Sequence, residues 1–326
     1  MRLSKAEKEE IIQLVERSEL GVGKTLQQLG IHKGTFYRWY KAYLNKDSAS
    51  LKPIASRRQW NTIPEAQKNL VVEIALEHPE LSPRELAVKL TDEQKVFISE
   101  SSVYRILKAK GLITSPAHIL LLASNEFRDK TAFVHQMWQT DFTYFKILGW
   151  GWYYLSTVLD DYSRYIVHWE LCESMKAEDV QRTVDQAIKK AALGRQQRPK
   201  LLSDNGSCYI ASELKGYLQT KQIEHIHGRP LHPQTQGKIE RYHRSMKNVV
   251  KLDNYYYPEE LNAALKNFVH YYNHQRYHES LDNVTPADVY FGRKEQILKQ
   301  RSKIKQQTLL KRRSQYQKEK QKLIYT

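Results

Sequence analysis

The pattern of hydrophobic and polar positions predicts that the first part of the chain is helical. Apolar residues recur at helical spacing over residues 5–17, behind the N-cap candidate Ser4, and again over residues 25–29. A third helix opens at Lys33, after Gly30 has ended the second. Three short helices with a tight turn before the last are typical of a helix-turn-helix domain, whose final helix enters the major groove of DNA.

The third of these helices carries the side chains that we expect to face DNA. Thr35, Tyr37 and Arg38 lie outside the apolar pair Phe36 and Trp39, which is expected to close the core. The alternative is a small helical bundle without DNA contacts. The charge of the chain favours DNA binding.

A second group of three helices follows a basic stretch without periodicity. It comprises residues 64–76, 82–90 and 101–108. Ser82 as N-cap and Glu85 three residues later form a capping box, which marks the middle helix. The last helix leaves polar side chains outside its apolar stripe, as a second recognition helix would. These side chains are Ser101, Ser102, Tyr104, Arg105 and Lys108.

Beyond residue 133 the helical period gives way to alternating, aromatic and β-branched residues, which predict strands. Strands alternating with helices favour an α/β domain with a mixed sheet and helices on its faces. The expected strands are 138–145, 153–159, 165–171, 201–202 and 223–226, and the expected helices are 176–192, 236–250 and 258–272.

Composition and charge narrow the choice of partner. The 52 Lys and Arg residues outnumber the 36 Asp and Glu residues, and the net charge of +16 indicates a polyanionic partner such as nucleic acid. The first helix is charged and no apolar run approaches the length of a membrane span, so we expect a soluble cytoplasmic protein with no membrane partner. Two cysteines, Cys172 and Cys208, exclude a disulfide framework and a cysteine-rich zinc site.

Three separated carboxylates suggest a metal site. Asp141 falls on the first expected strand, Asp204 at the carboxyl end of the fourth, and Glu240 on a helix, with 35 residues between the last two acids. Carboxylate oxygens suit Mg²⁺, which binds through one or two of them together with substrate phosphate. Two metal ions held this way support in-line phosphoryl displacement. Together with the basic charge, the acids point to phosphodiester chemistry on DNA.

The helix that carries Glu240 aligns three cations with it. Arg244, Lys247 and Lys251 follow at the fourth, seventh and eleventh positions, so all four side chains share one face. Such a face would direct one acid into a site and lay the cations along a polyanion. The alternative is an ordinary solvent-exposed charged stripe.

The segment from 138 to 292 resembles the integrase catalytic core of the DDE transposases, and the whole chain resembles a bacterial insertion-sequence transposase of the IS3/IS481 type. The spacing of Asp204 and Glu240 is that family's DD(35)E spacing, and Lys247 matches its basic residue that touches donor DNA. The motifs that carry the resemblance are Trp138-Gln139-Thr140-Asp141-Phe142-Thr143-Tyr144, Asp160-Asp161-Tyr162-Ser163-Arg164, Ser203-Asp204-Asn205-Gly206, His232-Pro233-Gln234-Thr235-Gln236-Gly237-Lys238-Ile239-Glu240-Arg241, and Tyr271-Tyr272-Asn273 through Arg276 and His278.

The resemblance implies an RNase H-like fold, two Mg²⁺ or Mn²⁺ ions, and a homo-oligomer that pairs two transposon ends on double-stranded DNA. Asp141, Asp204 and Glu240 are carried over as catalytic metal ligands. Lys238 and Arg244, on the same helix as Lys247, join it as expected DNA contacts. The chain departs from retroviral integrases, because it lacks the cysteines of their N-terminal zinc module, and it shows no clear leucine-zipper heptad.

These patterns predict a multidomain chain of helix-turn-helix modules followed by an α/β core and a basic tail. The tail is expected either as a solvated, partly helical extension or as a phosphate-binding arm. The expected divisions are a first helix-turn-helix domain at 1–47, a linker at 48–63, a second such domain at 64–112, a linker at 113–133, the catalytic core at 134–292 and the tail at 293–326.

The function expected from the sequence is that of a DNA transposase that binds terminal inverted repeats and performs metal-dependent cleavage and strand transfer. One alternative is a non-catalytic DNA-binding regulator with a relict core. Another is a metal nuclease without strand transfer. Five nearby ionisable residues could be mistaken for zinc ligands or catalytic groups, and they are His225, His227, His232, Asp160 and Asp161. The three histidines are expected to serve structural or DNA-backbone roles.

Overall fold

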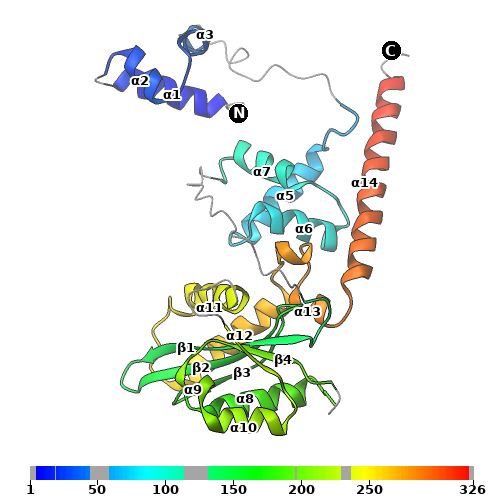
Figure 1. The fold of residues 1–326 in the computed structure, drawn as a ribbon. Coiled ribbons are helices and arrows are strands. Elements are labelled where there is room, and N and C mark those ends of the chain that lie inside the picture. The colour runs from blue at the N-terminus through cyan, green and yellow to red at the C-terminus, as the bar shows by residue number, and fades with distance from the viewer. Residues whose placement is uncertain are drawn as a thin grey trace. The chain divides into compact units, whose positions relative to one another are not determined.

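The protein, described here from a computed structural model, forms two compact units (Figure 1). One unit comprises residues 1–116 and 301–326, and the other comprises residues 117–300. The N-cap candidate Ser4, His232 and most of both expected linkers lie outside the described residues. The structure describes residues 5–18, 20–44, 59–113, 131–194, 197–228 and 236–322.

The first three helices of the chain enclose a small apolar core. They are α1 (Lys5–Arg17), α2 (Val22–Gln28) and α3 (Lys33–Leu44). Phe36 and Trp39 are buried in that core, as the sequence predicts. Helix α2 begins three residues earlier than its apolar pattern indicates, because its first turn contains glycine and lysine, which carry no hydrophobic signal.

Three further helices form the second helical group, α5 (Glu65–Glu77), α6 (Pro83–Gln94) and α7 (Glu100–Ala109). The expected capping box is present. The Ser82 hydroxyl accepts a hydrogen bond from the Glu85 N–H at 3.3 Å, and the Glu85 carboxylate accepts one from the Ser82 N–H at 3.0 Å. These two bonds satisfy amide groups that the helix itself leaves unpaired.

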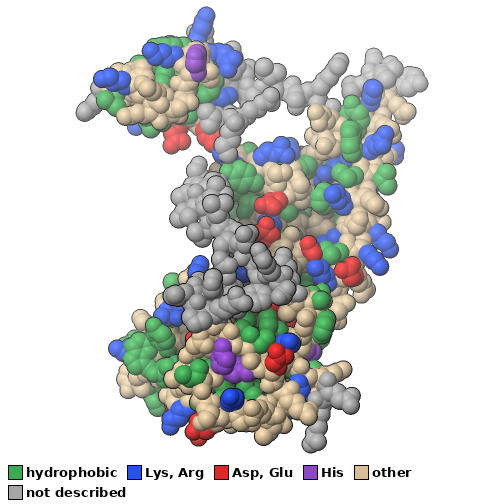
Figure 2. Space-filling model, in the orientation of Figure 1, with side chains coloured by type: hydrophobic (Ala, Val, Ile, Leu, Met, Phe, Trp, Pro, Cys, Tyr) green, Lys and Arg blue, Asp and Glu red, His purple; other side chains and the backbone are tan. Residues whose placement is uncertain are grey.

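The basic tail forms a single long helix, α14 (Lys294–Lys322). Figure 2 shows Lys and Arg side chains along this helix. From Arg301 onward it belongs to the first unit, where the Arg301 guanidinium donates to both Asp92 oxygens of α6 at 2.7 and 2.6 Å. The Thr308 hydroxyl accepts from the Phe97 N–H at 3.2 Å. This part of the tail is therefore a packed helix rather than a solvated extension.

The second unit is built on a five-stranded mixed sheet with the order β3-β2-β1-β4-β5. Strands β1, β2 and β3 are antiparallel, while β4 runs parallel to β1 and β5 runs parallel to β4. The mixed sheet expected from the sequence is therefore confirmed. The strands are β1 (Met137–Ile147), β2 (Gly151–Asp160), β3 (Ile166–Cys172), β4 (Lys200–Ser203) and β5 (His225–His227).

Helices cover both faces of the sheet (Figure 1). On one face, α8 (Ala177–Lys190) and α10 (Ser212–Thr220) pack on side chains such as Trp138 and Leu201. On the other, α11 (Gly237–Val250) and α12 (Pro258–His274) pack on side chains such as Phe145. The short elements are α9 (Ser207–Ile210), a 3₁₀ turn at Glu279–Leu281 and α13 (Pro286–Tyr290). Across the described residues, every helix is too short or too polar to span a bilayer.

Candidate active site

Strand register brings two of the three expected acids together. Met137 pairs with Lys200 and Gln139 pairs with Leu202 across the parallel strands β1 and β4. The same offset, continued for two residues, places Asp141 opposite Asp204, which follows the last residue of β4. Neighbouring strands lie about 4.8 Å apart. The two carboxylates therefore start from adjacent backbone positions at the end of β4.

One backbone hydrogen bond and a histidine hold the Asp141 carboxylate. Its Oδ1 accepts a hydrogen bond from the Phe142 N–H at 2.8 Å. Its Oδ2 lies 3.3 Å from Nδ1 of His243, a buried side chain of α11. His243 was not among the residues expected at the site, although its position three residues after Glu240 puts it on the same helix face.

The backbone around Asp204 forms a turn in which a glycine lies close to the carboxylate. Asp204 Oδ1 accepts from the Gly206 N–H at 2.9 Å, and a Cβ atom added at Gly206 would lie only 3.0 Å from that oxygen. The Asn205 side chain donates to the Gly228 carbonyl at 3.0 Å, which ties this turn to the residue after β5. The turn thus fixes where the carboxylate points.

The charges of Asp141 and Asp204 act on the same neighbours. Burial, followed by the negative charges of Asp204 and Asp141, raises the pKa of the Cys208 thiol to about 11. Burial and then Asp141 hold the pKa of Tyr209 well above its usual value, with Asp204 adding to the effect. A thiol with so high a pKa stays protonated and does not act as a nucleophile at neutral pH.

A buried polar network fixes the start of α11 against the sheet. Lys238 Nζ donates to the Asp161 carboxylate at 2.7 Å and to its carbonyl at 2.9 Å. The Gln139 amide donates to the other Asp161 oxygen at 2.7 Å and accepts from the Ile239 N–H at 3.1 Å. Lys238 was expected to contact DNA, but the structure gives it this internal partner, and we do not carry it into the proposed DNA interface.

The neighbouring residues singled out as structural also have internal partners. The Asp160 carboxylate accepts hydrogen bonds from the His135 N–H at 2.7 Å and the Ser163 hydroxyl at 2.6 Å. His225 Nε2 lies 2.9 Å from the Ser203 hydroxyl, and the His225 and His227 rings lie 4.1 Å apart. These contacts support the strand ends around the acids.

Glu240 lies on the exposed side of the first turn of α11. Within the described ranges, no three Asp, Glu, His or Cys side chains stand close enough together to hold a metal ion. The adjacent pair of Asp141 and Asp204 nevertheless has the donor chemistry of a magnesium site, because Mg²⁺ takes one or two carboxylates and completes its shell with phosphate and water. The carboxylates of Asp141 and Asp204 are therefore suitable ligands for Mg²⁺.

The rest of the Glu240 face is cationic. Arg244 and Lys251 are exposed, and Lys247 is partly buried. Lys247 Nζ lies 5.0 Å from the ring centroid of Tyr144 on β1. Burial and the charge of Lys251 lower the pKa of Lys247, while the charge of Asp141 opposes that shift. Lys247 therefore lies within electrostatic reach of Asp141.

The expected DNA-reading residues of the first unit lie on two helices. On α3, Tyr37 and Arg38 are exposed and Thr35 is partly exposed. On α7, Ser101 and Arg105 are exposed. The remaining pair of expected readers, both partly buried, comprises Ser102 and Tyr104.

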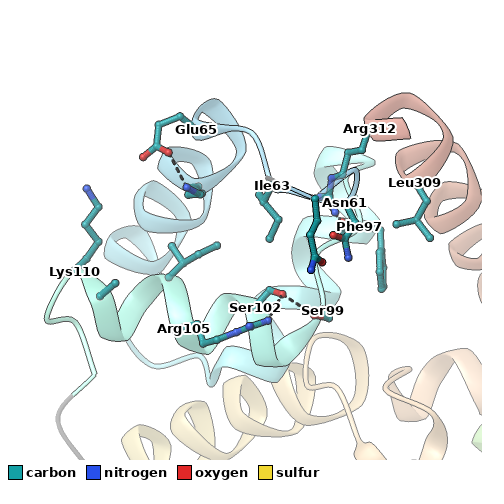
Figure 3. Close-up of a pocket in the computed structure, with 14 residues that line it drawn as sticks. Asn61, Ile63, Glu65, Phe97, Ser99, Ser102, Arg105, Lys110, Leu309 and Arg312 are labelled. Carbon is teal, nitrogen blue, oxygen red and sulfur yellow. Dashed lines mark hydrogen bonds and ion pairs between the residues drawn. The ribbon is translucent and has the colours of Figure 1, made fainter. Parts of the chain in front are cut away.

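A hollow of about 630 Å³ adjoins α7 within the first unit (Figure 3). Arg105 points along its floor, where its guanidinium donates to the Ser102 hydroxyl at 3.2 Å. Arg312 of α14 lies at the opposite rim and donates to the Phe97 carbonyl at 2.9 Å. In one wall of the hollow, the Glu65 carboxylate pairs with the Lys68 ammonium group at 2.8 Å, so these two charges neutralise each other.

Comparison with protein families matches most of this architecture to two kinds of domain. Residues 133–233 and residues 221–286 each match an integrase core domain. Residues 35–107 match a homeodomain-like domain, a match that begins in α3 and ends in α7. The acids Asp141 and Asp204 fall inside the first match, and Glu240 falls inside the second.

Two retroviral polyproteins are similar to part of the chain. The Gag-Pro-Pol polyprotein of squirrel monkey retrovirus is 31% identical over 115 residues, and that of Mason-Pfizer monkey virus is 28% identical over 120 residues. The aligned segments cover 35% and 36% of this chain and 6% of each polyprotein. The chain thus spans only a small part of the length of these relatives.

Solved structures of retroviral integrases are also similar. The HTLV-2 integrase catalytic core domain in complex with magnesium, in its trimeric form, is 19% identical with a TM-score of 0.40, over 48% of this chain and 97% of that one. The BIV integrase catalytic core domain is 22% identical with a TM-score of 0.38, over 50% of this chain and 97% of that one.

Proposed function

Since residues 133–286 of this chain belong to the integrase core domain family and form an RNase H-like fold, we propose that the protein is a DNA transposase. It binds the terminal inverted repeats of an element, cleaves phosphodiester bonds there and joins the ends to target DNA. The observation that carries the proposal is the adjacency of Asp141 and Asp204 beside the cationic face of α11.

Asp141, Asp204 and Glu240 are proposed as the catalytic metal ligands. Glu240 lies one helical turn before His243, whose ring contacts Asp141, so its side chain starts close to the acid pair. Two Mg²⁺ or Mn²⁺ ions would activate the attacking hydroxyl and stabilise the leaving oxygen. The chain itself contributes orientation, through the Phe142 N–H on Asp141 and the Gly206 N–H on Asp204.

Double-stranded DNA is the proposed partner at two levels. The exposed side chains of α3 and α7 read the terminal repeats, and the cations Arg244 and Lys247 of α11 hold phosphates near the acids. A homo-oligomer that pairs two ends then delivers both to one target. The net charge of +16 supports such extended contact with a polyanion.

The test uses DNA that carries the inverted repeats flanking the gene, a target plasmid and Mg²⁺. We expect joined products with the wild-type protein and none with Asp204→Asn, whose neutral side chain keeps the shape and loses the charge. The same pair of proteins should bind the repeat DNA equally in the absence of Mg²⁺. Equal amounts of joined product from both proteins would refute the assignment of the acids.

A second candidate function is a DNA-binding regulator with a relict core. It would use the exposed side chains of α3 and α7 to bind DNA without a reaction at the core. The joining assay separates the candidates, because a regulator binds repeat DNA without converting it. Cleaved ends that are never joined would instead identify a nuclease.

A further inference from the structure

Two exposed aromatic rings lie together on the β1–β2 hairpin. Tyr144 on β1 is 50% exposed and Trp152 on β2 is 51% exposed. Their rings meet edge to face, with centroids 5.3 Å apart. We refer to this pair as the aromatic platform. A single exposed aromatic residue is ordinary, but two in edge-to-face contact form an apolar corner, in which a flat partner can stack on one ring and contact the other.

The sheet explains why the platform is uncovered. Lys146 pairs with Trp152 in the antiparallel register, and Tyr144 lies two residues before Lys146, so all three side chains share one face. On that face α8 and α10 pack against Trp138, near the start of β1. Strand β4 pairs with β1 only at residues 137–139, so the far half of the hairpin extends beyond the covered part of the sheet.

Three lysines surround the platform. Lys247 and Lys251 of α11 place their ammonium groups 5.0 and 5.8 Å from the Tyr144 ring centroid, and Lys146 lies 5.8 Å from the Trp152 centroid. None of them belongs to an ion pair that the structure describes. Exposed ring faces with cations beside them, and no carboxylate paired with those cations among the described residues, match the chemistry of a nucleotide, which joins a π-face to a phosphate.

The platform lies close to the acids. Tyr144 follows Asp141 by three residues on β1, a distance of about 10 Å at roughly 3.3 Å per residue. Lys247 bridges the interval, since its charge interacts with Asp141 and its ammonium group lies over Tyr144. A DNA strand held on the platform would therefore lie near the first acid, with Lys247 between the platform and Asp141.

We propose that Tyr144 and Trp152 stack an unpaired base of the DNA end, while the neighbouring lysines hold its phosphates. This inference rests on the proposed function and deepens it by specifying the state of the substrate. A base exposes its flat face only when it is out of the duplex. The platform thus favours frayed or single-stranded ends and presents the adjoining phosphate to the acids.

The first test compares binding of a forked end and a blunt end of identical sequence, by fluorescence anisotropy in EDTA so that no chemistry intervenes. Wild type should prefer the forked end. The Tyr144→Leu/Trp152→Leu variant should lose about fivefold to 150-fold in affinity for the fork, the range for one stacked base, with blunt-end affinity unchanged. Tyr144→Phe keeps the ring and should keep the preference. Tyr256→Leu removes another tyrosine, 58% exposed, and should have no effect.

The second test is photocrosslinking with 5-iodouracil at the unpaired position. Crosslinked peptides are expected to contain Tyr144 or Trp152 in the wild type. Circular dichroism and sedimentation of the double variant check that its fold and oligomeric state are unchanged, as expected for two exposed side chains.

The outcomes separate this proposal from the proposed function. Equal binding of forked and blunt ends by wild type overturns the platform and leaves the transposase assignment standing. A double variant that changes oligomeric state but keeps the fork preference assigns the platform to contact with a second copy, which also overturns the proposal. If the wild-type protein does not bind repeat DNA at all, both the platform proposal and the transposase assignment are overturned.

Discussion

His243 Nδ1 lies 3.3 Å from Asp141 Oδ2, and this contact joins α11 to the strand that carries the first acid. The histidine is buried, with only 8% of its side chain exposed, whereas Asp141 retains 21%. Within the described part of the chain, the other ring nitrogen of His243 has no hydrogen-bond partner. The imidazole thus contacts Asp141 through Nδ1 and positions this carboxylate, which stays partly exposed to substrate.

Replacing His243 should impair catalysis more than binding. A group that orients a metal-ligating carboxylate typically contributes about 10- to 100-fold in activity or metal affinity. We expect His243→Phe to reduce strand transfer by about that factor and to raise the Mg²⁺ concentration needed for half-maximal rate, with repeat binding in EDTA unchanged. The control is His270→Phe, on α12, with no expected effect on either readout. An unchanged Mg²⁺ requirement would show that His243 does not position Asp141.

Lys238→Met tests the buried pair that fixes the start of α11. The Asp161 side chain is only 5% exposed, so removal of the lysine leaves a buried charge that keeps donors from Thr131 and Gln139. Breaking a buried pair typically costs about 3–5 kcal/mol. Because those donors are retained, we expect Lys238→Met to lower the local stability of the first turns of α11 by about 3 kcal/mol. Faster amide hydrogen exchange in these turns would measure that loss.

The double variant Lys238→Met/Asp161→Asn provides the control for this pair. Removing both charges should recover part of the lost protection, because no uncompensated charge remains. A loss of DNA affinity in Lys238→Met without any change in hydrogen exchange would instead restore the sequence-based expectation that this lysine contacts DNA.

His225 predicts a pH dependence of stability in the second unit. Burial, assisted by the charge of His227, lowers the pKa of His225 from 6.5 to about 4. Between those values the unfolded chain binds a proton that the folded chain does not, so stability is highest above pH 6.5 and falls as the pH drops towards 4. Urea unfolding across this window should show the decline in the free energy of unfolding. His225→Gln should reduce the slope of that free energy against pH by an amount that corresponds to at most one proton taken up on unfolding.

His168 supplies the matched comparison. It lies on β3, and burial likewise lowers its pKa to about 4. His168→Gln should therefore remove a separate portion of the same pH dependence, and the two effects should add because the residues are on different strands. A slope that His225→Gln leaves intact would show that the ring is protonated equally in the folded and unfolded chains.

Sequence patterns predicted the elements whose signals are local. The capping box of Ser82 and Glu85 and the position of Asp204 at the end of β4 depend on residues a few positions apart, and both are confirmed. The mixed sheet and the resemblance to integrase cores are also confirmed. The catalytic roles of the acids stay a prediction.

Contacts between distant residues were beyond these patterns. Lys238 was expected to contact DNA, yet it has an internal partner, Asp161, which is 77 positions away, and no periodicity connects the two residues. The His243 contact with Asp141 and the aromatic platform depend on how α11 and β2 pack on β1. Alternation indicates which face a side chain occupies, but not where a covering helix ends.

The contact between Arg301 and Asp92 allows a final prediction, on how the basic tail is held in the first unit. The guanidinium binds both carboxylate oxygens, with side chains 14% and 26% exposed, and hydrogen bonds to a charged group contribute about 1.5–3 kcal/mol. Arg301→Ala should therefore increase protease cleavage within α14 beyond residue 301.

Reversing the pair, with Asp92→Arg and Arg301→Asp, should recover much of the protection. Lys294→Ala, which removes a pair with Asp282 at 2.7 Å in the second unit, should leave cleavage beyond residue 301 unchanged. Equal cleavage of wild type and Arg301→Ala would show that packing around Thr308 and Arg312 holds the helix without this pair.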